Sequence, residues 1–281
     1  MKKMKKQKLV THIITRVIEL ICLYLFMIMP RIFGQPKKGP FMGVLYAHRG
    51  LHDNDGGIPE NSMKAFKRAV ESGYGIELDV QLTKDGVPVI FHDFTLERMC
   101  GVSGKLENLT YEQLTKLTLL HTDEKIPTLQ EFLDMVAGKV PLIVELKIER
   151  INVSLCPAVQ SLLDDYKGVY CIESFNPLAL LWYRINKREV MRGQLSTNFR
   201  YDGNYRTPLY FFLTHLLTNC ITRPDFIAYN HCFKKEPSRI ICRKLFKNLA
   251  IAWTVKNQEE LDSIRDDFNL FIFEGFVPEE S

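Results

Sequence analysis

Residues 75–93 read GIELDVQLTKDGVPVIFHD and contain two short β-rich runs, Gly75–Val80 and Val87–Phe91. A Lys84-Asp85-Gly86 turn joins the two runs, so there is no room for a helix between them. In the first run, Glu77 and Asp79 are two residues apart, and the alternation of a strand places both carboxylates on one face. This segment predicts a strand with two converging carboxylates, followed at once by a second strand.

Outside this segment, short β-rich runs alternate with helical stretches, which is typical of a parallel α/β fold. The predicted strands are residues 43–47, 75–80, 87–91, 141–145, 169–172, 190–195, 225–229, 251–255 and 270–273. The predicted helices are residues 62–72, 110–117, 128–137, 153–163, 177–186, 238–248 and 258–267. Nine strands are one more than an eight-stranded barrel needs. The second and third are the pair in which we expect the extra strand, because only a short turn joins them. The chain of 281 residues exceeds the roughly 250 that a TIM-type barrel typically needs. We therefore expect an α/β TIM-type (β/α)8 barrel preceded by an N-terminal hydrophobic helix.

The composition is that of a globular protein, with 46% hydrophobic and 25% charged residues. Such a chain buries enough apolar surface to fold, so disordered, collagen-like and coiled-coil classes are excluded. Seven cysteines are scattered without a CxxC pair or a zinc spacing. They indicate reduced, buried thiols rather than a disulfide framework.

The net charge of +4 is unevenly distributed along the chain. Residues 1–40 contain nine Lys and Arg and one acidic residue, Glu19, so the remaining residues have a net charge of −4. A nucleic-acid-binding protein would carry its basic charge on the folded body, which argues against nucleic acid as a partner. Lysines beside an apolar run point to anionic lipid instead.

Residues 9–29 form an apolar run long enough to cross a hydrocarbon core of about 30 Å. Three interpretations are open: a signal-anchor helix, a helix lying on a membrane surface, or a cleaved signal peptide. Pro30 and the Gly34–Pro40 stretch indicate a terminator and a linker. We expect a membrane-associating segment over residues 1–40 and one catalytic domain over residues 41–281. Five lysines before the run weakly favour a cytoplasmic N-terminus, whereas the cysteines favour a reducing compartment for the body, so its side of the membrane stays open.

Polar residues follow several predicted strands, where barrel enzymes build their sites. The first strand is followed by His48 and Arg49, the third by His92, and Glu60 lies in the first loop. The fourth strand ends in Glu145, with Lys147 two residues later on the same face.

These residue types together suit a metal-assisted reaction on an anion. Glu77, Asp79 and Glu145 supply the oxygen ligands that Mg²⁺ or Ca²⁺ takes, and a cation removes the penalty of burying them unpaired. The two histidines, His48 and His92, suit general acid–base chemistry near neutral pH. Cationic groups such as Arg49 and Lys147 suit a phosphate. The set predicts metal-assisted phosphodiester hydrolysis, with one divalent Mg or Ca ion as cofactor.

The ordered motifs resemble those of the glycerophosphodiester phosphodiesterase family. They are His48-Arg49-Gly50, Pro59-Glu60-Asn61-Ser62, Glu77-Leu-Asp79-Val80, Thr83-Lys-Asp-Gly86, Val89-Ile-Phe-His92-Asp93 and Glu145-Leu-Lys147, and further similar segments extend the resemblance over about residues 44–275.

The resemblance implies a phosphodiesterase TIM barrel that hydrolyses glycerophosphodiesters to sn-glycerol 3-phosphate and an alcohol. His48 and His92 would be the catalytic pair. Glu77, Asp79 and Glu145 would hold the metal, and Arg49, Lys147 and Glu60 would bind substrate or phosphate. Two alternatives stay open: a lysophospholipase D-type activity on acylated substrates, and an inactive membrane-anchored binding protein.

Two segments depart from the family pattern. The last strand and the residues after it read Leu270-Phe-Ile-Phe-Glu-Gly-Phe-Val-Pro278, with Glu274 as the final polar residue of the strand. This departure is expected to alter the rim of the substrate site rather than the metal site. Asn198–Arg223 is Tyr- and Arg-rich and then apolar. It is interpreted either as the sixth loop and helix of the barrel, packed inward, or as an element that touches a membrane or covers a lipid-like substrate.

Overall fold

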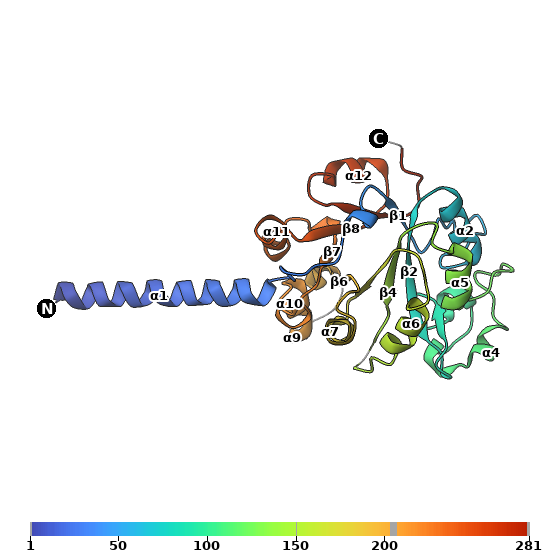
Figure 1. Cartoon of the computed structure of the whole chain (residues 1–281), viewed down its shortest axis with the longest axis horizontal. Coiled ribbons are helices and arrows are strands. Elements are labelled where there is room, and N and C mark those ends of the chain that lie inside the picture. The colour runs from blue at the N-terminus through green and yellow to red at the C-terminus, as the bar shows by residue number, and fades with distance from the viewer. Residues whose placement is uncertain (1, 150, 203–206, 280–281) are drawn as a thin grey trace.

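A computed structural model describes residues 2–149, 151–202 and 207–279. Eight parallel strands close into a barrel surrounded by helices, and one long helix projects from its side (Figure 1). The strands are β1 (Leu45–His48), β2 (Gly75–Leu82), β3 (Pro88–Ile90), β4 (Leu142–Leu146), β5 (Tyr170–Ser174), β6 (Arg192–Ser196), β7 (Phe226–Asn230), β8 (Leu249–Val255) and β9 (Leu270–Phe273). The predicted TIM-type barrel with a preceding helix is confirmed.

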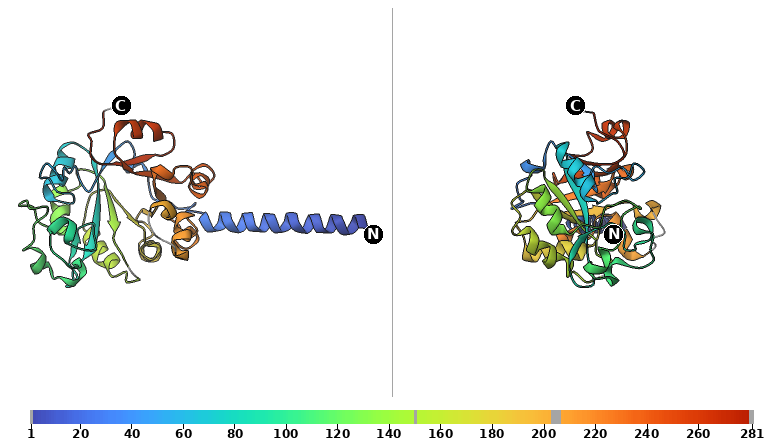
Figure 2. Two further views of the ribbon diagram at one scale, coloured as in Figure 1. Left: turned by 180° about the vertical axis from the view of Figure 1, so that it is seen from behind. Right: turned by 90° about the vertical axis from the view of Figure 1, so that its right-hand side faces the viewer.

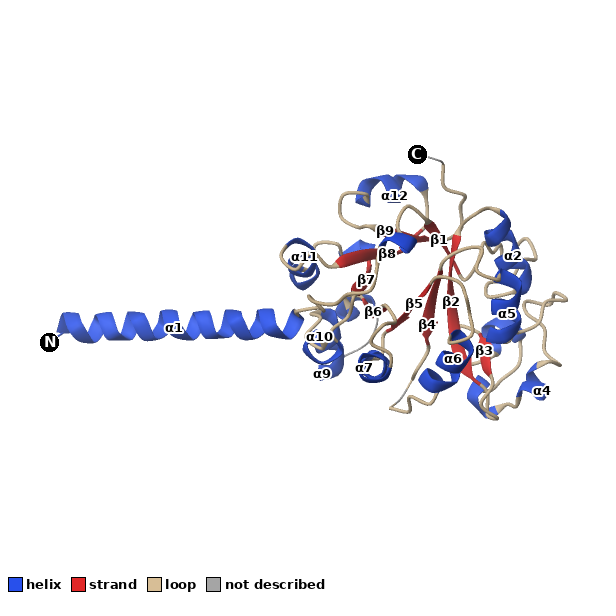
Figure 3. Ribbon diagram, viewed as in Figure 1, coloured by secondary structure: helices blue, strands red, loops and turns tan. Residues whose placement is uncertain are grey.

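The helices that surround the barrel mostly match the predicted ones (Figure 3). They are α2 (Met63–Glu71), α3 (Glu97–Cys100), α4 (Tyr111–Leu114), α5 (Leu129–Val136), α6 (Leu155–Leu163), α7 (Pro177–Asn186), α8 (Phe199–Asp202), α9 (Pro208–Thr214), α10 (Asn219–Thr222), α11 (Pro237–Lys244) and α12 (Gln258–Ile264), after the N-terminal α1 (Lys2–Ile28). The helix expected over residues 110–117 is confined to α4. Thr128 and Glu131 form a capping box at α5, as the sequence indicates.

The two predicted strands that a short turn joins are β2 and β3, which form an antiparallel hairpin. The strand β2 also pairs in parallel with β1 and β4, so β3 stands outside the closed barrel. The segment after β3 has its own small core, which includes Val89, Leu96, Leu106 and Ile126. The extra strand is therefore the start of an insertion between the second and third barrel strands.

The main core lies between the barrel and its helices, and a second cluster fills the barrel near the start of its strands. Phe41 belongs to the inner cluster, together with Tyr46 and Phe226. Gly193 on β6 lies directly against Phe226, and a Cβ atom at this glycine would fall 1.9 Å from the ring. Only glycine fits at this contact, because interiors are close-packed.

Residues 198–223 follow β6, which is the fifth strand of the barrel because β3 lies outside it. The expectation that they form the sixth loop and helix is therefore wrong by one position. Three short helices, α8, α9 and α10, replace a single helix here, while residues 203–206 of the stretch lie outside the described residues. Leu213 and Leu216 are buried, whereas Leu209, Phe211 and Phe212 are exposed, so only one side of this segment is packed inward.

The helix α1 extends away from the barrel for most of its length (Figure 2). Its residues Lys5–Ile28 are long and apolar enough to cross a membrane. Its C-terminal end differs from the rest, because Ile28 is fully buried in the main core.

Candidate active site

The predicted site residues lie at the carboxyl ends of neighbouring strands, where the barrel register aligns them. His48 on β1 pairs with Glu77 on β2, and Asp79 pairs with Glu145 on β4. Single oxygen atoms of Glu77, Asp79 and Glu145 lie within 4.8 Å of one another, and all three residues are buried. The structure thus brings together the three carboxylates that the sequence predicts as a metal site.

The three carboxylates have unequal electrostatic surroundings. Burial and the charges of Asp79 and Glu145 raise the pKa of Glu77 well above its usual range. Burial also raises the pKa of Glu145, although Lys147 opposes the effect. For Asp79, the positive charges of His92, Lys147 and Arg49 outweigh burial and lower the pKa. At neutral pH, the cluster therefore resists carrying three negative charges without a compensating cation.

A divalent cation fits this donor set. Oδ1 of Asp79 is buried and has no hydrogen-bond partner among the described residues, so it is available as a ligand. Carboxylate oxygens are the ligands that Mg²⁺ and Ca²⁺ take. A bound cation would also relieve the repulsion that raises the pKa of Glu77.

A fourth buried carboxylate, Glu173, belongs to the same site. It is the penultimate residue of β5, pairs in register with Glu145, and is 1% exposed. Burial and the charge of Glu145 raise its pKa well above the usual range, and its Oε2 has no hydrogen-bond partner in the described structure. The sequence analysis missed it, although an acidic residue at the end of the fifth predicted strand was the available signal.

Each of the two predicted catalytic histidines is oriented by a carboxylate. Nδ1 of His48 donates a hydrogen bond to Oε2 of Glu274, at the end of β9. Nδ1 of His92 donates to Oδ1 of Asp93 over 2.6 Å. Because Nδ1 is engaged in both rings, Nε2 is the atom left for chemistry, and Nε2 of His48 lies 3.8 Å from Oε2 of Glu77.

Both histidines line a small cavity of about 100 Å³ at the mouth of the barrel. Its other lining residues include Arg49, Glu77, Glu145, Glu173, Phe175 and Trp253. Burial and the charge of Arg49 lower the pKa of His48, while Glu274 acts in the opposite direction. A neutral His48 is suited to accept a proton.

The cationic residues are tied to the acidic cluster. Nε of Arg49 lies 3.3 Å from Oδ2 of Asp79, and Nζ of Lys147 lies 3.1 Å from Oε1 of Glu145. Burial disfavours the charged form of Lys147, but Glu145 and Asp79 raise its pKa above the usual value. Both cations therefore stay charged beside the cavity.

Glu60 lies behind Arg49 rather than in the cavity. Its carboxylate accepts hydrogen bonds from Nη1 of Arg49 over 2.6 Å and from both terminal nitrogens of Arg98. Arg98 also binds Asp93 through Nε over 2.6 Å, so one guanidinium connects the partner of His92 to the partner of Arg49. Sequence analysis did not single out Arg98, because its role depends on the fold of the insertion after β3.

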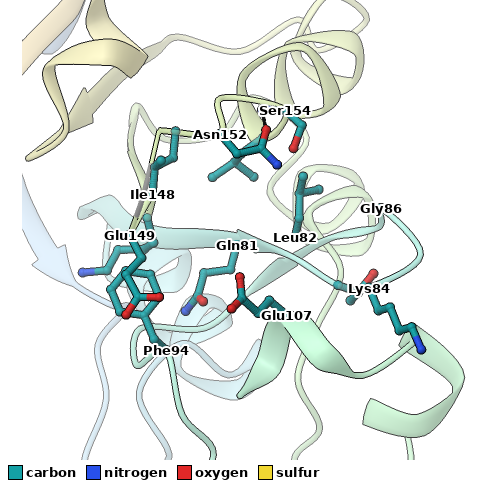
Figure 4. Close-up of a pocket in the computed structure, with 13 residues that line it drawn as sticks. Gln81, Leu82, Lys84, Gly86, Phe94, Glu107, Ile148, Glu149, Asn152 and Ser154 are labelled. Carbon is teal, nitrogen blue, oxygen red and sulfur yellow. Dashed lines mark hydrogen bonds between the residues drawn. The ribbon is translucent and has the colours of Figure 1, made fainter.

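Two larger hollows adjoin the site. One of about 450 Å³ lies between the β2–β3 hairpin and the segment after β4, and Figure 4 shows Gln81, Phe94 and Glu149 on one side of it and Asn152 and Ser154 on another. The other, of about 540 Å³, shares Glu145, Phe175 and Trp253 with the cavity and continues to Phe199 and Tyr210. Both are larger than the cavity between the histidines, but only the small cavity contains both histidines.

Residues 48–267 match the profile of the Glycerophosphoryl diester phosphodiesterase family. A glycerophosphodiester phosphodiesterase of Caldanaerobacter subterraneus subsp. tengcongensis is 39% identical over 150 residues, which are 49% of this chain and 60% of that protein. Glycerophosphodiester phosphodiesterase 1 of Homo sapiens is 43% identical over 95 residues, which are 30% of this chain and 28% of that protein. The chain thus spans less than two thirds of the length of each of these curated relatives.

Solved structures show the same fold over most of the chain. A glycerophosphodiester phosphodiesterase of Thermotoga maritima has a TM-score of 0.63 and 25% identity, and the match covers 82% of this chain and 94% of that chain. A phosphodiesterase of Oleispira antarctica, solved in complex with the product sn-glycerol-3-phosphate, has a TM-score of 0.67 and 23% identity, over 83% and 93% of the two chains.

Proposed function

Since the chain belongs to the glycerophosphoryl diester phosphodiesterase family, we propose that it hydrolyses glycerophosphodiesters to sn-glycerol 3-phosphate and an alcohol. One observation carries the proposal: a cluster of buried carboxylates faces two histidines across a cavity at the barrel mouth. This combination serves phosphodiester hydrolysis, in which a developing charge and two proton transfers must be managed together.

We propose Glu77, Asp79 and Glu145 as the ligands of one divalent ion, Mg²⁺ or Ca²⁺. When bound, such an ion polarises a phosphoryl oxygen as a Lewis acid. Arg49 and Lys147 remain charged beside these carboxylates and attract the phosphate of the diester. Glu60 holds the guanidinium of Arg49 in place.

The two histidines divide the proton transfers between them. We assign His48 as the base that accepts a proton at Nε2 from the attacking water, since burial keeps it neutral. His92 then donates a proton from Nε2 to the oxygen of the leaving alcohol. Glu274 and Asp93 fix the two rings through Nδ1, which presents Nε2 to the reaction.

The test is release of glycerol 3-phosphate from glycerophosphocholine by the full chain, with EDTA, Mg²⁺ or Ca²⁺. The proposal expects release only with a divalent ion, and its loss in His48→Ala and His92→Ala. His12→Ala, on the exposed part of α1, serves as the matched control and keeps full activity. Metal-independent release, or full activity of either cavity variant, contradicts the assignment. A folded protein that is inert with each ion moves the assignment to acylated substrates, or to an inactive binding protein if those are not turned over either.

A second candidate activity is a lysophospholipase D-type reaction on acylated substrates. A row of aromatic rings favours it: Trp253 contacts Phe175 with centroids 5.6 Å apart, Phe175 contacts Phe199 at 5.9 Å, and Phe199 contacts Tyr210 at 5.0 Å. The row follows the larger hollow from the cavity to α9 and offers an apolar path for an acyl chain.

Comparing two substrates separates the two activities. If acyl chains use the aromatic row, Tyr210→Ala lowers turnover of lysophosphatidylcholine and leaves that of glycerophosphocholine unchanged. No turnover of lysophosphatidylcholine by the unaltered chain excludes the second activity.

We further propose that residues 9–29 associate the protein with a membrane. In α1, the apolar side chains from Leu9 to Phe26 are largely exposed, a state that water disfavours over so large a surface. Sedimentation of the full chain with lipid vesicles at high salt tests the proposal. A chain that stays with the aqueous phase in detergent-free buffer contradicts it.

A further inference from the structure

The helix α1 is fixed to the body that it carries. The carbonyl oxygen of Ile28 accepts hydrogen bonds from Nδ2 of Asn219 over 2.8 Å and from Sγ of Cys242 over 3.2 Å. Nη1 of Arg223 donates to the carbonyl of Met29 over 2.7 Å, and the amide of Arg31 donates to Pro224 over 3.0 Å. These contacts leave no flexible spacer between the end of the helix and the barrel.

The length of the exposed helix sets the distance from a bilayer to the body. The stretch from Leu9 to Phe26, which carries the exposed apolar side chains of α1, is 18 residues long and extends about 27 Å at 1.5 Å per residue. A bilayer has a hydrocarbon core of about 30 Å. If α1 spans such a core, the core takes up the whole apolar part of the helix, so the part of the body around Ile28 lies in the headgroup layer.

That part of the body is positively charged. Arg31, Arg184, Arg188 and Arg223 gather there: Nη1 of Arg31 donates to the carbonyl of Arg188 over 2.8 Å, and Nη1 of Arg184 donates to the carbonyl of Ile221. The guanidinium of Arg223 lies over the ring of Phe26, 4.9 Å from its centroid. Of the nearby acids, Asp225 is buried between Arg31 and Arg192, Glu236 is paired with His215, and Glu189 is exposed. The chain after residue 40 has a net negative charge, so this concentration of arginines is local.

Exposed apolar side chains lie on the helices at this end of the body. The end of α1 contacts α10, which packs against α7, and α9 lies near α10 (Figures 1 and 2). Their exposed apolar residues include Ile185, Leu209, Phe211, Phe212 and Ile221, with exposed fractions of 40% to 67%. Arginines interspersed with aromatic and aliphatic side chains are typical of surfaces that lie in the headgroup region of anionic membranes.

We propose that this junction face, formed by Arg184, Arg188, Arg223 and the apolar side chains of α7, α9 and α10, binds the headgroup layer of an anionic bilayer. The contact fixes the orientation of the barrel to the membrane, in addition to the anchoring by α1. The inference rests on the proposed membrane insertion of α1 but not on the phosphodiesterase chemistry.

The test uses tryptophan as a depth probe in the full chain. Phe212→Trp on α9 and Glu112→Trp on α4, on the opposite side of the body in Figure 1, are reconstituted into vesicles of brominated phosphatidylglycerol or brominated phosphatidylcholine. Trp182 and Trp253 give the same background in both proteins, and flotation with the vesicles verifies that α1 is inserted.

The proposal expects the Phe212→Trp signal to fall at least twofold in brominated phosphatidylglycerol, less in brominated phosphatidylcholine, and the Glu112→Trp signal to be unchanged. Adding Arg188→Glu weakens the quenching, whereas Lys116→Glu, the matched charge reversal next to α4, does not. Equal quenching of the two probes in floated protein contradicts the proposal that the junction face contacts the headgroup layer. Equal quenching of Phe212→Trp by the two lipids contradicts the preference for anionic headgroups. If the Phe212→Trp signal responds to protein density instead of lipid bromination, a second copy of the chain covers this face and the proposal is wrong. Failure of flotation, in contrast, contradicts the anchoring by α1.

Discussion

Oε2 of Glu274 accepts a hydrogen bond from Nδ1 of His48, so the last barrel strand holds the first catalytic candidate in place. Burial favours the neutral form of this carboxylate, but the hydrogen bond with His48, aided by the nearby His52 and Lys256, outweighs burial and lowers the pKa of Glu274. The family departure at Glu274 thus lies in the site rather than only at its rim.

Replacing Glu274 by Gln is expected to lower kcat about 10- to 100-fold with little change in KM, as for other residues that orient a functional histidine. Because the Glu274 charge raises the pKa of His48, its loss moves the acidic limb of the kcat/KM profile to lower pH. Steady-state kinetics across pH measure both effects, with the exposed Glu259→Gln as control. A purely structural role would lower activity without moving the limb.

Glu77→Gln is expected to change thermal stability in opposite senses with and without metal. In EDTA, removing one of the four crowded carboxylates relieves repulsion, and a gain of about 1 kcal/mol would raise Tm by about 2–4 °C. With saturating Mg²⁺ or Ca²⁺, the unaltered chain gains stability from the ion and the variant gains less. Thermal unfolding in both buffers decides the matter, with the exposed Glu71→Gln as control. An identical metal-induced shift in the Glu77→Gln and unaltered proteins would remove Glu77 from the ligand set.

Glu60 is expected to contribute to stability in a defined pH range. Burial favours the neutral form, but the hydrogen bond from Arg98 and the charge of Arg49 prevail and lower the pKa to about 2 from the usual 4.5. A depressed carboxyl pKa stabilises the fold above the unfolded-state value, and the contribution is lost as pH falls from about 5 to about 2. Its size is on the order of 2 kcal/mol, because the half-exposed Arg98 is screened by water.

The measurement is the free energy of unfolding from pH 7 to pH 2 for the unaltered chain and Glu60→Gln. The difference between them should shrink steadily below pH 5. A difference that stays constant across this range would mean that Glu60 acts by packing alone.

Gly193→Ala is expected to destabilise the barrel by about 1–3 kcal/mol or more, since the new methyl group overlaps the Phe226 ring in a close-packed interior. Gly39→Ala is the matched control, because a Cβ there meets no atom within 4 Å. Urea unfolding at neutral pH compares the two variants. Equal midpoints would show that Phe226 can move aside.

The strands and the cluster of three carboxylates were predictable because they depend on local periodicity and on position at strand ends. All nine predicted strands exist, and Glu77, Asp79 and Glu145 meet because parallel strands end at one rim. Glu173 was missed because one acidic residue at a strand end gives a weak signal. Only the closure of the barrel, which pairs β1 with β9, shows that Glu274 reaches His48.

The insertion and the N-terminal junction depended on tertiary contacts that no local pattern shows. Arg98 binds both Glu60, which is 38 residues away in the sequence, and Asp93, which is 5 residues away. The burial of Ile28 was equally invisible, because an apolar residue at the end of an apolar helix looks the same in lipid and in a protein core. The three helices in segment 198–223 are each too short to show a helical periodicity in the sequence, so the pattern could not predict them.

The burial of Ile28 also determines how far the barrel can move from its anchor. A barrel on a flexible tether could search a volume of solution around its anchor, but a helix that ends inside the core allows no such excursion. If α1 crosses a bilayer, the barrel mouth stays at one height above the lipid surface. It then meets only molecules that lie within that thin layer, as the protein diffuses laterally or as they enter the layer from solution.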